Sequence, residues 1–110
     1  MTSYTACGEA GYGWAQFDVE GELTSIGVRV EPNSLAVYLT SFVPYHTRRA
    51  VWTGAEAVLM GRAVCSGQMH PAILADWCDE NEPFRCDRDF DPAKWLRKAM
   101  LVIDTSELPF

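Results

Sequence analysis

The residues best suited to hold a metal ion are three cysteines and one histidine in the second half of the chain. Cys65, His70, Cys78 and Cys86 give the spacing C-x4-H-x7-C-x7-C. Structural zinc sites normally include a close pair such as C-x2-C, which places two ligands on one tight turn, and that pair is missing here. Cys78 also lies beside Trp77 on a face predicted to be buried, as a core thiol would. A zinc-binding module is therefore kept only as an alternative, and no metal site is expected.

A second candidate metal motif is the alternation of aspartates in Asp87-x-Asp89-x-Asp91. An EF-hand loop that begins at Asp87 needs glycine at its sixth position and glutamate at its twelfth, where this chain has Pro92 and Lys98. The start of a helix explains Asp89 and Asp91 without a metal, because its dipole favours each negative charge by about 0.3 to 1 kcal/mol. No calcium site is expected.

The two histidines, His46 and His70, are the candidates for general acid-base chemistry. His46 has no serine, cysteine or carboxylate close to it in the sequence, and the chain contains no G-x-S-x-G motif. The glycines of Gly11-Tyr12-Gly13 lack the further residues of a phosphate-binding loop. A small enzyme or enzyme subunit that uses His46 and His70 therefore remains an alternative, and the protein is not expected to be an enzyme.

The most distinctive feature of the chain is the acidic stretch 76–91. It contains seven carboxylates and two arginines, hence a local charge of −5, while the whole chain carries −6. A sequence pI near 4.7 argues against general binding to nucleic acid, which requires clustered lysine and arginine. The same charge distribution suits a basic protein partner.

Part of this acidic stretch opposes the local electrostatics of the predicted structure. Asp79 and Glu80 fall at the carboxyl end of a predicted helix, where negative charge is unfavourable. Residues that break a local rule are better candidates for function than those that follow it. Trp77 and Phe84 are candidate hydrophobic anchors, and the alternative is that the stretch is only a solvated loop. The predicted partner-binding residues are Asp76, Asp79, Glu80, Glu82, Phe84 and Asp87.

The function predicted from this stretch is that of a small acidic, non-enzymatic interaction domain. Immunity proteins and phage or plasmid anti-defence inhibitors share this size and charge, and the comparison depends on those two properties alone. The expected partner is a basic protein, such as a nuclease or a nucleic-acid-binding complex. No cofactor, no direct contact with nucleic acid and no membrane is expected, and the oligomeric state is left open.

Length and composition are those of one compact domain, 1–110, with enough apolar residues for a core. The chain has 110 residues, of which 48% are hydrophobic. Residues 1–14 have neither a basic region nor an apolar run of the secretory type, and no run approaches the roughly 18 residues that span a bilayer. A cytoplasmic protein with reduced, mostly buried thiols is expected.

In the first half of the chain, alternation of apolar and polar residues predicts an antiparallel meander of three strands. A flexible lead-in is expected at 1–13, and the strands at 14–19, 22–30 and 35–43. A short hairpin connection at 20–21 is expected to join the first two strands. Tyr38 and Phe42 lie on the second face of the third strand. They could form a binding patch, but packing against a helix or a further strand is the favoured interpretation.

The second half predicts a polar connector at 44–49 and then three helices. A capping box at Thr53 and Glu56 indicates that 54–65 is a helix, with a buried strand as the alternative. Pro71 and the pair Asp91-Pro92 mark the starts of the other two helices. These are expected at 71–80 and at 92–101 or slightly longer, followed by a loose tail at 105–110. The predicted fold class is α+β: a three-stranded antiparallel meander with three helices packed against it.

Overall fold

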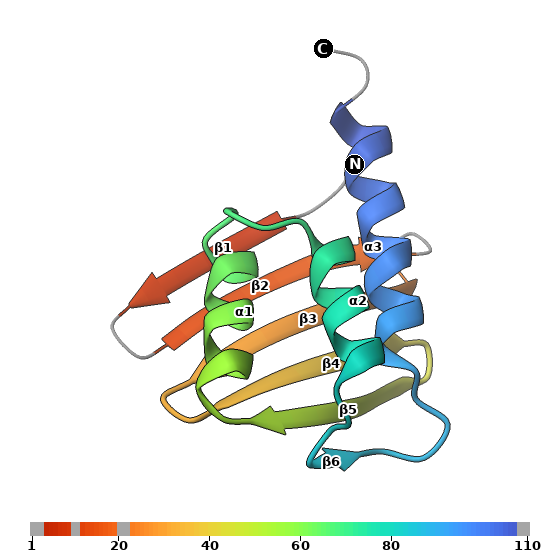
Figure 1. The fold of residues 1–110 in the computed structure, drawn as a ribbon. Coiled ribbons are helices and arrows are strands. Elements are labelled where there is room, and N and C mark those ends of the chain that lie inside the picture. Colours follow the sequence, from red (N-terminus) through yellow and green to blue (C-terminus); the bar gives the residue numbers. More distant parts are fainter. Residues whose placement is uncertain (1–3, 10–11, 20–22, 108–110) are drawn as a thin grey trace.

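The computed structural model describes residues 4–9, 12–19 and 23–107 of the chain. Its architecture is α+β, with an antiparallel sheet and three helices on one of its faces (Figure 1). The elements in chain order are β1 (Tyr4–Glu9), β2 (Tyr12–Val19), β3 (Thr24–Glu31), β4 (Ser34–Phe42), β5 (Tyr45–Thr53), α1 (Ala55–Cys65), α2 (Pro71–Glu80), β6 (Arg85–Cys86) and α3 (Pro92–Glu107).

The described strands form a single sheet in the order β1-β2-β3-β4-β5-β6, and every neighbouring pair is antiparallel. Strands β1 to β5 make a continuous meander, and the two-residue strand β6 adds to the far side of β5. A tight turn at Pro32 and Asn33 joins β3 to β4, with Glu31 opposite Ser34. The α+β class is confirmed, but the prediction of three strands was wrong.

The additional strands come from segments whose composition resembles that of loops. The predicted lead-in 1–13 contains β1 and the start of β2, in which Gly8 is paired with Gly13. Residues 45–49 of the predicted connector belong to β5. In β5 only Ala50 and Trp52 are buried, so the strand shows no apolar alternation at its start. The predicted hairpin at 20–21 lies outside the described residues.

The core fills the space between the sheet and the helices. In β2, β3 and β4 every second side chain faces the helices, which follows from the period-two alternation of strands. The largest fully buried side chains of the sheet are Phe17, Val19, Ile26, Val28, Val30, Leu35 and Val37. Leu74 of α2 and Leu96 of α3 close the core from the other side. The strand prediction for these three segments is confirmed.

Helix α1 lies very close to the sheet. A Cβ atom added to Gly61 would be 2.4 Å from Val30 Cγ2 and 2.7 Å from Leu35 Cδ1. Glycine therefore allows the helix backbone to approach β3 and β4 directly. The segment is a helix, as favoured, but it begins at Ala55, and its N-cap Gly54 provides no side-chain cap. The predicted capping box was wrong, because the Glu56 carboxylate accepts a hydrogen bond from Trp77 Nε1 at 3.0 Å instead.

Helices α2 and α3 begin where the sequence predicts. His70 precedes Pro71 as the N-cap of α2, and its Nδ1 accepts a hydrogen bond from the Ala72 N–H at 3.4 Å. Asp91 Oδ1 accepts from the Lys94 N–H at 3.3 Å at the start of α3. Helix α3 continues to Glu107, which is beyond the predicted end at 101 or slightly later. Residues 105–107 are therefore helical rather than a loose tail.

The three helices all lie on the same face of the sheet, so the other face carries no described element (Figure 1). Tyr38 is half-buried on that open face, and Phe42 is 44% exposed. The Phe42 ring meets only its hairpin neighbour Tyr45 among the described rings, with centroids 6.2 Å apart. The expectation that a helix or another strand covers these rings was wrong.

Candidate interaction surface

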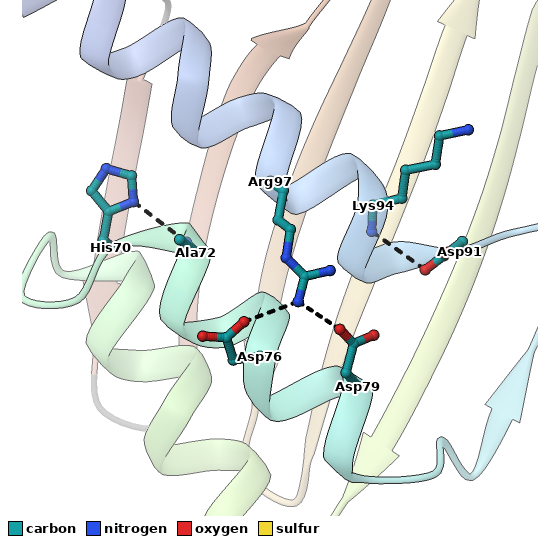
Figure 2. A network of polar contacts seen from close by, with 7 residues as sticks. All are labelled: His70, Ala72, Asp76, Asp79, Asp91, Lys94 and Arg97. Carbon is teal, nitrogen blue, oxygen red and sulfur yellow. Dashed lines mark hydrogen bonds and ion pairs between the residues drawn. The ribbon is translucent and has the colours of Figure 1, made fainter.

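The acidic stretch 76–91 is divided among α2, β6 and the start of α3. Asp76 and Asp79 lie on α2 and are directed toward α3 (Figure 2). Asp91 is used as the cap of α3, as described above. The stretch is therefore not one continuous patch, and its carboxylates have different neighbours.

Arg97 of α3 lies between two of the predicted partner-binding carboxylates (Figure 2). Its Nη2 donates to Asp76 Oδ1 at 2.9 Å and to Asp79 Oδ2 at 2.5 Å. These hydrogen bonds raise the pKa of Arg97, the bond to Asp79 more than the bond to Asp76. The side chains remain largely in solvent, with Asp76 71% and Asp79 52% exposed. The two aspartates thus help to join α2 to α3 and still present carboxylate oxygens to solvent.

Arg97 also compensates for the unfavourable end of α2. The last turn of α2 has no basic residue of its own, so Arg97 supplies the cation that favours Asp79 near a helix carboxyl terminus. Glu80 and Glu82 have no such compensation. Both are exposed, and neither side chain forms a hydrogen bond or ion pair with the part of the chain that the structure describes.

Asp87 and Phe84 flank the strand β6 and have contrasting surroundings. Asp87 is bonded twice to Arg49 of β5: its Oδ2 accepts from the Arg49 N–H and its own N–H donates to the Arg49 carbonyl, both at 2.9 Å. The carboxylate therefore holds β6 against β5. Phe84 is anchored only through its backbone, which donates to the Val51 carbonyl at 2.8 Å, and its side chain is 74% exposed.

Trp77, the other candidate anchor, is part of a joint between the helices and the sheet. Its ring centroid is 6.0 Å from that of the buried Trp52, and its Nε1 donates to Glu56. Asn81 completes the joint, because its carbonyl accepts from Trp52 Nε1 and its Nδ2 donates to the Trp77 carbonyl, both at 2.9 Å. A half-buried ring with these contacts holds α2 on the sheet.

The thiols and histidines are distributed over the fold. Cys65 and Cys78 are buried, as expected, and burial raises the pKa of each thiol to about 12. Cys86 is exposed. His46 lies on β5, while His70 caps α2.

Among the residues that the structure describes, no cluster of three or more histidine, cysteine, aspartate or glutamate side chains could hold a metal ion. None of the described helices combines the length and the apolar character needed to cross a membrane.

One group of polar residues on the open face was missed by the sequence analysis. Arg29 of β3, Arg49 of β5 and Arg85 of β6 line a common hollow together with Tyr38 and Phe84. These residues are far apart in the sequence and meet only through the register of β3 to β6. The alternation of β5, had it been recognised, would have placed Arg49 on the same face as Tyr38.

Comparisons of this chain with models of protein families, with curated proteins and with solved structures gave no match. Function is therefore inferred from the contacts, exposure and charges of the residues described above. The two surfaces that stand out are the exposed carboxylates around the end of α2 and the arginine-lined hollow on the opposite face of the sheet.

Proposed function

We propose that the protein is a small non-enzymatic interaction domain, an inhibitor that docks an acidic surface onto a basic, nucleic-acid-binding protein. The surface, which we call the acidic edge, consists of Asp76, Asp79, Glu80 and Glu82. The observation that supports it best is that all four residues are exposed at the end of α2 and that Arg97 is the single cation paired with them among the described residues. The acidic edge thus retains a negative charge.

The two halves of the acidic edge have different tasks in this proposal. Arg97 holds Asp76 and Asp79 in a fixed position, which lowers the entropy lost when a partner orders them. Glu80 and Glu82 are available for lysine or arginine side chains of the partner. Such carboxylates attract a basic surface from a distance and mainly raise the association rate.

Phe84 is the proposed hydrophobic anchor of the contact. It follows Glu82 by two positions and is exposed, and buried aromatic side chains commonly dominate the binding energy of an interface. Asp87 and Trp77 are left out of the proposed contact, because their side chains are engaged in holding β6 and α2 in place.

The proposal is tested by neutralising the two unpaired carboxylates, Glu80→Gln and Glu82→Gln. The tagged protein is used to capture partners from a lysate of its native host, with the double variant in parallel. We expect basic nucleic-acid-binding proteins to be retained by the original chain and lost from the variant. With an identified partner, we expect the association rate at low salt to fall by about tenfold, because electrostatic steering is lost.

A matched control changes the net charge by the same amount away from the acidic edge. Leu59→Lys and Gln68→Lys replace two exposed residues and also make the chain less negative by two charges. This control should capture the same partners as the original chain. Capture and association rates that do not change in the Glu80 and Glu82 variant would show that the acidic edge is only a solvated surface.

A further inference from the structure

The open face of the sheet contains a hollow of about 290 Å³ that lies over β3, β4, β5 and β6. Three arginines line it, Arg29, Arg49 and Arg85, together with the rings of Tyr38 and Phe84. In β3, β4 and β5 its lining residues Arg29, Tyr38 and Arg49 alternate with the buried core residues, so the hollow is on the face that the core does not occupy. The three helices, with the Arg97 pairs that join α2 to α3, lie on the other face (Figure 1).

The charge of this hollow is opposite to that of the chain. Glu31 is the one acidic residue in its lining, and it pairs with Arg29 at 3.2 Å. The side chains of Arg49 and Arg85 form no hydrogen bond or ion pair within the described part of the chain. Two unpaired guanidinium groups in a protein of net charge −6 therefore make a local site for an anion.

The rest of the lining favours a ligand that also has a planar apolar part. Tyr38 and Phe84 offer aromatic rings, and Ala36 and Val51 add apolar surface. Aromatic side chains stack on planar rings such as nucleobases, and such a stack contributes about 1–3 kcal/mol per base. An inorganic anion alone would leave these rings without a contact.

The backbone beneath the hollow argues against an extended peptide as the ligand. Strand β4 is paired with β3 and β5, and the end of β5 is paired with β4 and β6. A peptide that binds by adding a strand needs an unpaired strand edge, and the strands under the centre of the hollow have none. Recognition is left to guanidinium groups, rings and the hydroxyls of Tyr38 and Ser34.

We infer that this hollow binds a nucleoside monophosphate, with the phosphate at Arg49 and Arg85 and the base against Tyr38 and Phe84. A phosphate dianion matches the planar donor geometry of two guanidinium groups. The volume of about 290 Å³ is near the lower limit of pockets that bind small molecules, about 300 Å³. This suits one nucleotide rather than a large cofactor.

The inference is tested by titrating the full chain with adenosine monophosphate and following backbone amide resonances. We expect the largest shifts at Tyr38, Arg49, Val51 and Arg85. Adenosine, which has no phosphate, and inorganic phosphate, which has no ring, should each bind at least about tenfold more weakly. Arg49→Gln and Arg85→Gln should each raise the Kd by about tenfold or more, as expected when a charged hydrogen bond is lost.

Arg48→Gln is the matched control, because Arg48 is the neighbour of Arg49 on β5 and its side chain belongs to the other face of the sheet. It should leave the Kd within twofold of the original. The inference is overturned if millimolar adenosine monophosphate causes no shifts in the hollow, or if Arg48→Gln weakens binding as much as Arg49→Gln. Equal binding of inorganic phosphate, or tighter binding of an acidic peptide at the same residues, would overturn it as well.

Discussion

Arg97 shows how a residue on one helix can change the role of carboxylates on another. Asp76 and Asp79 stand out in the sequence as an excess of negative charge, but in the fold each has a partner. Both side chains are more than half exposed, and ion pairs in solvent add little to stability. The main effect of Arg97 is to fix the position of the two carboxylates.

Replacing Arg97 by glutamine tests this account at the level of one residue. We expect a small decrease in the unfolding midpoint in urea at low salt, because Asp76 and Asp79 then repel each other without a cation between them. The decrease should vanish near 1 M salt, where the screening length is about 3 Å. Lys94→Gln removes the same charge from the same helix without removing an ion pair to a described residue, and it should have a smaller effect at low salt.

The sequence predicts where the carboxylates lie but not which of them are already engaged. Asp87 accepts a hydrogen bond from Arg49, and Asp91 caps α3. Glu80 and Glu82 have no such contacts within the described part of the chain. The partners of Asp76, Asp79 and Asp87 are distant in sequence, so no local pattern reveals them. The role of Asp91 as a helix cap is predicted correctly, because an N-cap depends only on residues that are close in sequence.

Among the helices and strands, the sequence best predicts those that are buried on one face and exposed on the other. Strands β2, β3 and β4 alternate clearly because one face of each packs on helices. Strand β5 extends beyond that cover, and its first residues are exposed on both faces, so the alternation that identifies a strand is absent. Apolar spacing predicts all three helices, and the start signals are correct for α2 and α3. The end of α3 lacks a comparable stop signal.

The contact of α1 with the sheet leads to a prediction about Gly61. Gly61→Ala should destabilise the protein, because the new methyl group would lie too close to Val30 and Leu35. Overpacking of this kind costs about 1–3 kcal/mol, while the better helix propensity of alanine returns about 1 kcal/mol. The net loss is measured by chemical denaturation. Arg62→Ala, at the exposed neighbouring position, should stay within about 0.5 kcal/mol of the original, and an equally stable Gly61→Ala variant would contradict the close packing.

The whole molecule brings two surfaces of opposite charge together on one small domain. The carboxylates are concentrated in one stretch of sequence, so their excess is visible before the fold is known. The arginines of the hollow come from β3, β5 and β6, and only the complete sheet unites them. The overall charge of −6 therefore reflects the acidic edge and gives no indication of the positively charged hollow.

The stability of the whole molecule should depend on pH through its buried thiols. Burial raises the pKa of Cys65 and Cys78 from an ordinary value of 9.0 to about 12. Above pH 9 the unfolded chain loses protons that the folded chain keeps, so the stabilisation present below pH 9 is lost as the pH rises toward 12. We expect the free energy of unfolding to fall through this window.

The contribution of the thiols is isolated by measuring the free energy of unfolding as a function of pH for the original chain and for a Cys65→Ala, Cys78→Ala variant. The slopes of the two curves are then compared. All other ionisable groups are common to the two proteins, so their contribution cancels in the comparison. The variant should be less stable at pH 8 but should lose less stability between pH 9 and 12. Identical slopes would show that the thiols ionise equally easily in the folded and unfolded chains.

The alternation of side chains along β5 has a consequence for how this chain can change during evolution. Ala50 and Trp52 enter the core, while Arg49 and Val51 belong to the hollow. Substitutions can alter one face and leave the other intact. An insertion or deletion of one residue within the strand would exchange the two faces, removing Trp52 from its buried joint and Arg49 from the hollow at once. In β5 the length of the strand is therefore under stronger constraint than the identity of its exposed residues.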